Sequence, residues 1–315
     1  MSAGEHLPDV TGHISIEARK VRRRGAPPRR GGVGELTRNA LKLTEGRIGL
    51  VFTVIVLLVA FIGPWVAPNE PAKVVGMPYA QPGGEWLFGL DSIGRDVLSR
   101  FLSGGDVLLL MSLACAVVGV GVGTALGLIA GYWRGALGSI IMRTLDIVLS
   151  FPALLLALLF LSILGTNPWI ILLTVAISHI PYVARVVEAS SLAITGRRYV
   201  QYAEMIGTPR WRILSREILP GITAPLTVQF GIRFTWSIAT IASLAFLGFG
   251  RKPPAVDWGV MVQENQIALI TSPLTVMLPV LGIVFATIGA NLLTDAFGQA
   301  AGLEIKRSTR KKRKK

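Results

Sequence analysis

The stretch that decides the fold is IGLVFTVIVLLVAFIGPWV, which runs from Ile48 to Val66 and contains no charged residue. A transmembrane helix needs about 20 consecutive, mostly apolar residues, and this stretch is long enough. It begins too far along the chain, and is too long, to be the apolar region of a cleaved signal peptide. The first prediction is therefore a membrane-spanning helix at residues 48–66.

Five more apolar segments predict an all-α, polytopic membrane protein with six transmembrane helices. The chain is 51% hydrophobic and only 16% charged, whereas a soluble domain is about 25% charged. This composition excludes a soluble globule and a disordered chain. The single cysteine, Cys115, excludes an internal disulfide and a Cys-rich zinc site. The later spans are expected at Val107 to Trp133, Ile140 to Leu164, Pro168 to Ala184, Ile222 to Phe249 and Leu274 to Phe297.

The positions of the basic residues predict the orientation in the membrane. The chain has 32 Lys+Arg against 18 Asp+Glu, a net charge of +14, and most of the basic residues lie in the two tails and between the fourth and fifth spans. Positive residues stay on the cytoplasmic side, so both termini are expected to be cytoplasmic. The tails lack aromatic residues for base stacking and any folded nucleic-acid-binding motif. We therefore expect contact with the lipid bilayer or a partner surface, and no nucleic acid.

The expected domain division follows from these spans. Glycines Gly119, Gly123 and Gly127 recur at every fourth position of the second span and predict close helix packing rather than a nucleotide-binding loop. In GRDVLSR (94–100), Asp96 and Arg100 are expected to pair on an interfacial helix, the alternative being a seat for a partner protein. The divisions are a basic disordered cytoplasmic tail (1–47), the first span (48–66), an extracytoplasmic loop (67–106), a five-helix core (107–298) with a cytoplasmic loop at 188–220, and a basic cytoplasmic tail (299–315).

The segment 188–220 (EASSLAITGRRYVQYAEMIGTPRWRILSREILP) is the longest internal polar stretch on the predicted cytoplasmic side. Residues 203–206 predict a short helix that Gly207 ends. Thr208 then favours an N-cap, with Pro209 at the first helical position. The next helix is expected to carry Trp211, Leu214 and Ile218 on one face. Such a helix–Gly–helix elbow suits docking to a soluble partner, and a lipid-surface amphipathic loop is the alternative.

This elbow resembles the EAA loop of ABC-importer permeases. Gly207 and Leu219-Pro220 have the spacing of that motif, whereas Gln201-Tyr202-Ala203 replaces Glu-Ala-Ala. Three further segments resemble the C-type permease subunit of the peptide/nickel importer family, and the resemblance runs from about Ile48 to Leu293. It implies the type I ABC importer permease fold. The three segments are FGLDSIGRDVLSRFLSG (88–104), LDIVLSFPALLLAL (145–158) and SLAFLGFGRKPPAVDWGVMVQE (243–264).

The resemblance implies a permease subunit in the cytoplasmic (inner) membrane of a prokaryote. The expected cargo is a di- or oligopeptide, or alternatively a nickel chelate, opine or glycoside. The implied partners are a second homologous permease, two ATP-binding subunits and an extracytoplasmic solute-binding protein. The chain has no G-x-x-x-x-G-K-[ST] phosphate loop, so we expect no enzyme and no bound cofactor, with ATP and Mg held by the partner subunits. The residues implied to contact an ATP-binding subunit are Ala203, Glu204, Gly207, Thr208, Arg210, Trp211 and Arg212.

Charged groups inside the spans are the remaining candidates for function. Arg233 in the fifth span is expected to face the translocation path or the second permease, where it can meet a peptide carboxylate. His179 either lines the path or is a packed, hydrogen-bonded residue. Arg143 and Asp146 are expected to pair with each other. No metal site is expected, and the sparse acidic residues within the spans argue against a proton-coupled secondary transporter.

Overall fold

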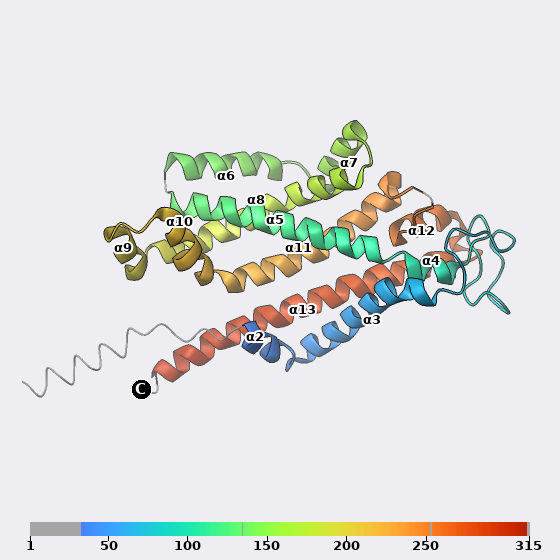
Figure 1. The fold of residues 1–315 in the computed structure, drawn as a ribbon, viewed down its shortest axis with the longest axis horizontal. Coiled ribbons are helices and arrows are strands. Elements are labelled where there is room, and N and C mark those ends of the chain that lie inside the picture. The colour runs from blue at the N-terminus through green and yellow to red at the C-terminus, as the bar shows by residue number, and fades with distance from the viewer. Residues whose placement is uncertain (1–32, 134, 253, 314–315) are drawn as a thin grey trace, which may run out of the picture.

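The structure is a computed structural model that describes residues 33–133, 135–252 and 254–313. These residues form an elongated bundle of long helices with short helices at both ends (Figure 1). The α-helices are α2 (Val33–Ala40), α3 (Thr44–Val66), α4 (Val97–Ser103), α5 (Asp106–Tyr132), α6 (Ala136–Leu149), α7 (Ala153–Leu164), α8 (Pro168–Thr195), α9 (Arg198–Met205), α10 (Arg210–Arg212), α11 (Thr223–Leu244), α12 (Trp258–Asn265) and α13 (Leu274–Arg313). Two π-helical segments, η1 (Ile213–Ile218) and η3 (Ala245–Phe249), and two 3₁₀ turns, η2 (Leu219–Gly221) and η4 (Gln266–Leu269), complete the described chain.

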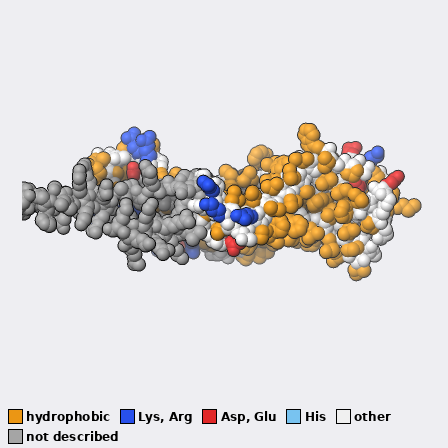
Figure 2. Space-filling view, turned by 90° about the horizontal axis from the view of Figure 1, so that it is seen from below, with side chains coloured by type: hydrophobic (Ala, Val, Ile, Leu, Met, Phe, Trp, Pro, Cys, Tyr) orange, Lys and Arg blue, Asp and Glu red, His pale blue; other side chains and the backbone are white. Residues whose placement is uncertain are grey.

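Five helical segments are long and apolar enough to cross a membrane, and a sixth exists if α6 and α7 together count as one span. The expected third span is therefore not one straight helix, because α6 and α7 meet at 82°. Pro152 explains the break: it has no backbone N–H, its ring clashes with the preceding turn, and it disfavours a helical conformation at Phe151. Figure 2 shows a broad hydrophobic surface over the bundle, as a lipid-facing protein requires.

The glycine stripe of α5 packs against α8, as predicted. A Cβ atom added to Gly123 would lie 2.7 Å from Val183 Cβ, and one added to Gly127 would lie 2.5 Å from the carbonyl oxygen of Ala184. Gly121, which lies between stripe positions, has open space around it. These glycines allow α5 and α8 to form the most extensive helix contact among the described residues.

The described parts of both predicted tails are helical, although the N-terminal tail (1–47) was predicted to be disordered. Helix α2 and the first turn of α3 fall inside the predicted disordered tail of residues 1–47, and the rest of that tail (1–32) lies outside the described residues. Helix α2 is held because Ala40 packs with Ala296 and Phe297 of α13. Helix α13 continues through the predicted basic tail to Arg313.

The loop before α4 is held by buried charges. Asp91 accepts from Arg95 Nε at 2.6 Å and from Arg100 Nη1 at 2.5 Å, and Glu264 of α12 lies 2.7 Å from both guanidiniums. The predicted Asp96–Arg100 pair is wrong, since Asp96 instead caps the N-terminus of α4. Residues 94–100 also do not form a helix exposed at the membrane interface, because the Arg100 side chain is only 1% exposed.

Helix α12 seals the same end of the bundle. Trp258 is fully buried, stacks on Phe101 at 5.3 Å and donates its indole N–H to the Phe101 carbonyl oxygen at 2.8 Å. Asp257 caps the helix by accepting from the Gly259 amide at 2.7 Å. Burial raises the pKa of Asp257, an effect that outweighs the hydrogen bonds to its carboxylate and the nearby Arg251 charge.

Candidate functional site

Residues 198–221, from α9 to η2, form a compact elbow at the end of the bundle opposite α4 and α12 (Figure 1). The bend is made at Gly207, which has a φ of 75°. This left-handed conformation favours glycine, because a Cβ atom is strained there. The Thr208 amide donates to the Ala203 carbonyl oxygen at 3.0 Å and closes the end of α9. The sequence-predicted elbow is therefore present, with its bend at the predicted glycine.

The second arm of the elbow differs from the prediction. The residue that precedes α10 is Pro209, and no side chain caps the helix, so the predicted Thr208 cap is wrong. The chain then enters the π-helix η1, whose hydrogen bonds span five residues. Ile213 and Ile218 are five residues apart and both are fully buried, whereas Trp211 is 63% exposed. The predicted face of Trp211, Leu214 and Ile218 assumed an α-helical period that this segment does not have.

The inner face of the elbow packs into a hydrophobic core that it shares with α5 and α8. Val200, Ala203, Ile213 and Ile218 pack with residues near the ends of α5 and α8, including Leu128. Ala203 is buried within this core, so it faces the bundle and not the surface. The elbow therefore moves with α5 and α8 unless this core is opened.

Polar contacts brace the elbow to the end of α5. The Tyr132 hydroxyl interacts with the Glu204 carboxylate. The Arg210 guanidinium lies 5.8 Å from the centre of the Trp133 ring, in a cation–π arrangement. Tyr132 and Trp133 themselves meet edge to face at 5.0 Å. Glu204 and Arg210, both expected at a partner contact, thus also contact their own chain.

The outer face of the elbow is apolar, and the described part of the chain leaves it uncovered. Four large side chains around Gly207 are more than half exposed, and Arg212 lies 5.5 Å from the ring of one of them, Trp211. Sequence reasoning identified Trp211 and Arg212 and missed the others. The missed signal was the presence of large apolar residues on both sides of a glycine in a polar segment. The four side chains are Tyr202, Met205, Ile206 and Trp211.

Inside the bundle, His179 of α8 and Ser237 of α11 are both buried. The Ser237 hydroxyl donates to the Arg233 carbonyl oxygen at 2.9 Å, so it accepts from His179 Nε2, also at 2.9 Å. His179 is therefore packed and hydrogen-bonded between α8 and α11. The Arg233 guanidinium lies 4.9 Å from the centre of the Tyr182 ring. The predicted pair of Arg143 with Asp146 is wrong, because Asp146 pairs with Arg185 of α8 instead.

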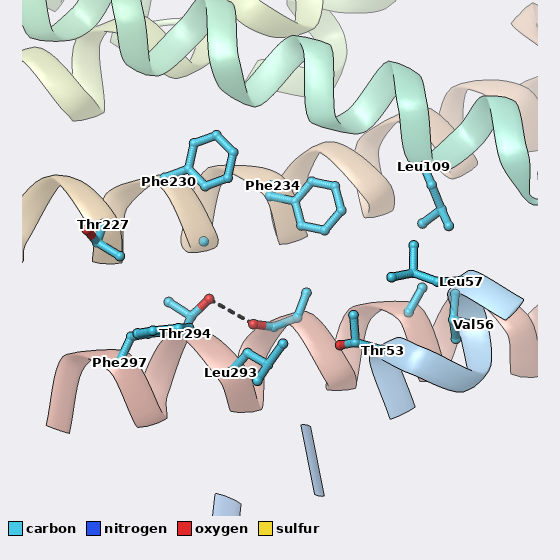
Figure 3. A pocket seen from close by; sticks show the side chains of 13 residues that line it. Thr53, Val56, Leu57, Leu109, Thr227, Phe230, Phe234, Leu293, Thr294 and Phe297 are labelled. Carbon is cyan, nitrogen blue, oxygen red and sulfur yellow. Dashed lines mark hydrogen bonds between the residues drawn. The ribbon is translucent and has the colours of Figure 1, made fainter. Parts of the chain in front are cut away.

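A cavity of about 190 Å³ lies between α3, α5, α11 and α13. Apolar side chains such as Phe230, Phe234 and Leu57 line most of it, and Thr294 bonds back to the Ala290 carbonyl oxygen (Figure 3). No group of three or more His, Cys, Asp or Glu residues that could hold a metal ion occurs in the part of the chain that the structure describes. The cavity therefore offers shape and apolar surface rather than reactive groups.

Residues 123–303, more than half of the chain, match the family described as the binding-protein-dependent transport system inner membrane component. The chain belongs to this family. It is a permease component of an ABC importer and not an enzyme, as predicted. The permease is 35% identical over 259 residues to a glutathione transport system permease protein of Pectobacterium atrosepticum, covering 81% of this chain and 86% of the relative. It is 34% identical over 259 residues to a putative peptide transport system permease protein of Brucella suis, covering 82% and 87%.

Proposed function

We propose that this permease is one of the two membrane subunits of an importer that carries short peptides, glutathione among them, across the inner membrane at the expense of ATP. The peptide class is supported by the names of the relatives, which are permeases for glutathione and for peptides. The observation that carries the coupling to ATP is the uncovered apolar outer face of the elbow.

The outer face of the elbow has the properties of a docking surface. Exposed aromatic and Met side chains next to arginine are enriched where protein surfaces meet. Its members lie within a short segment around the rigid bend at Gly207, so a partner that pulls on them moves both arms. The proposed contact residues are Gly207, Thr208, Trp211 and Arg212, together with Tyr202, Met205 and Ile206.

The remaining predicted docking residues take a different part in this proposal. Ala203 anchors the inner face, while Glu204 and Arg210 touch the partner with their exposed atoms and hold the end of α5 through Tyr132 and Trp133. Movement of an ATP-binding subunit then passes through the elbow into α5 and α8. The elbow works as a lever because its inner face is packed.

The proposed assembly contains this chain, a second homologous permease, two ATP-binding subunits that hold ATP and Mg, and an extracytoplasmic solute-binding protein. Both termini and the elbow lie on the cytoplasmic side in this arrangement, as the distribution of Lys and Arg supports. The translocation path runs past Arg233. His179 fixes α8 to α11 through its hydrogen bond with Ser237, which lies one helical turn after Arg233.

Co-purification of the ATP-binding subunits tests the docking surface. Trp211→Ala removes an elbow side chain that is 63% exposed, and Trp169→Ala removes one that is 71% exposed at the opposite end of α8. We expect Trp211→Ala to reduce the recovery of ATP-binding subunits at least several-fold, since a central aromatic contact typically contributes about 2 kcal/mol or more. Trp169→Ala should leave recovery unchanged. Equal recovery with both variants would refute docking through this face.

A further inference from the structure

One face of α11 carries a row of polar and aromatic residues that the bundle covers only in part. Gln229, Arg233, Trp236, Thr240 and Ser243 are spaced by four and three residues, so they lie along one side of the helix. Trp236 is 59% exposed and the other four are half-buried. We call this row the α11 polar stripe. Buried residues such as Ser237, Ile238 and Ile241 occupy the side of the helix that packs into the bundle.

Two groups of this stripe have unused hydrogen-bonding capacity. Gln229 Oε1 and Arg233 Nε are buried and have no hydrogen-bond partner. Within the described residues the guanidinium of Arg233 makes no ion pair, and it lies over the ring of Tyr182. Burial of polar groups without partners costs free energy. A donor and an acceptor therefore remain unpaired one helical turn apart.

The stripe does not face lipid in a stable assembly. An arginine at the centre of a spanning helix costs about 2.5–3.5 kcal/mol in insertion measurements unless it meets water or a partner group. Tyr182 adds a second polar side chain on the same side, because its ring stacks on Arg233 and remains 44% exposed. The surface that contains Arg233, Gln229 and Tyr182 therefore faces an aqueous space or another polar molecule.

We propose that Arg233 and Gln229, with Tyr182 holding the guanidinium, form a transient binding site for the carboxylate end of a peptide within the translocation path. This inference rests on the proposed function. A guanidinium can donate two parallel hydrogen bonds to one carboxylate. Gln229 precedes Arg233 by four residues on the helix, so the Cβ atoms of the two residues lie about 5–6 Å apart. The Gln229 amide can pair with the adjacent peptide N–H or C=O, so the pair matches both groups at a peptide C-terminus.

The chemistry of the site predicts discrimination by charge. A peptide whose carboxylates are converted to amides keeps its shape and hydrogen-bonding groups but loses the anion that the guanidinium recognises. Tyr182 packs against one face of the guanidinium, and Nε has no hydrogen-bond partner that would compete with that anion. The site therefore favours carboxylate-bearing peptides over their amides, independently of what the solute-binding protein prefers.

The test compares two substrate mixtures in proteoliposomes that contain the full transporter. One is a casein digest of short peptides, and the other is the same digest after conversion of its carboxyl groups to amides. ATP-dependent uptake is measured by mass spectrometry for the unmodified permease, Arg233→Gln and Arg233→Lys. Arg143→Gln serves as the control, because it removes an exposed arginine from α6. The solute-binding protein is the same throughout, so its preference cancels when variants are compared.

We expect Arg233→Gln to lower uptake of carboxylate peptides about tenfold, which corresponds to the loss of about 1.4 kcal/mol. Uptake of the amides should stay within about twofold of that by the unmodified permease, because Arg233 contacts only the carboxylate. Arg233→Lys, which keeps the charge, should lie between. Equal losses for both mixtures would overturn the inference and assign Arg233 to pairing with another subunit, and equal uptake by all variants would overturn it as well. If the unmodified transporter takes up neither mixture with ATP, the proposed function itself fails.

Discussion

The substitution Gly127→Ala tests the packing of α5 on α8 with a single methyl group. The added Cβ would lie 2.5 Å from the Ala184 carbonyl oxygen and 2.7 Å from Val187 Cβ. Ordinary contact begins near 3.4 Å, so the two helices would have to separate by about 0.9 Å. Because the obstacle is backbone, no rotamer change relieves it. We expect a loss of about 1–3 kcal/mol, the usual cost of overpacking a core.

The control is Gly121→Ala on the same helix, where a Cβ would meet nothing within 4 Å. The assay is the thermal unfolding midpoint of the purified permease in one detergent. A loss of 1–3 kcal/mol corresponds to a fall of about 2–12 °C, using the shift per kcal/mol known for soluble domains of comparable size. Gly121→Ala should leave the midpoint unchanged or raise it slightly, because alanine favours helix. Equal midpoints for the two variants, or a higher midpoint for Gly127→Ala, would refute the packing argument.

Three further predictions concern the two ends of the bundle. Asp91→Asn should destabilise the permease by about 3–5 kcal/mol, because it removes a carboxylate that pairs with buried Arg100; unfolding in denaturant checks this, and an unchanged midpoint would contradict it. Tyr132→Phe should lower transport per ATP hydrolysed without lowering recovery of the ATP-binding subunits, because only the interaction of the hydroxyl with Glu204 is lost. A lower recovery of the ATP-binding subunits would instead show a docking role for Tyr132. Gly207→Ala should destabilise the bend of the elbow by about 1–2 kcal/mol, because an alanine is strained at the positive φ of this position. We expect weaker retention of the ATP-binding subunits, and unaltered retention would count against a rigid bend.

Features that depend on local sequence were predictable. An uncharged run such as residues 48–66 has few alternatives to a membrane helix, since lipid leaves no partner for an open backbone. The glycine stripe of α5 and the bend at Gly207 were also predictable, because in each case the absence of a Cβ atom has a direct geometric consequence.

Features that depend on which distant residues meet were not predictable. Asp96 had a candidate partner at Arg100 in its own helix, yet Arg100 pairs with Asp91 and with Glu264 of α12, far along the chain. Asp146 likewise found a partner in α8 and not in its own helix. Helical spacing identifies possible pairs, but the tertiary fold decides among them.

The π-helix of the elbow was a second feature that could not be predicted from the sequence. An α-helical period of 3.6 grouped Trp211 with Leu214 and Ile218 on one face, whereas the π-helical segment η1 buries Ile213 together with Ile218. Trp211, in α10 just before η1, is exposed and does not share the buried face of Ile218. A local departure from ideal helix geometry thus altered the candidate site itself, as is often found at functional positions.

ATP-driven uptake measures directly whether peptide import is powered through the outer face of the elbow. Proteoliposomes would contain this permease, its partner permease, the ATP-binding subunits and the solute-binding protein, with the permease either unmodified or carrying Trp211→Ala and Met205→Ser. We predict peptide accumulation that requires ATP and that the double variant abolishes, while the control Trp169→Ala retains it. Accumulation without ATP, or full ATP-driven accumulation by the double variant, would contradict coupling through this face.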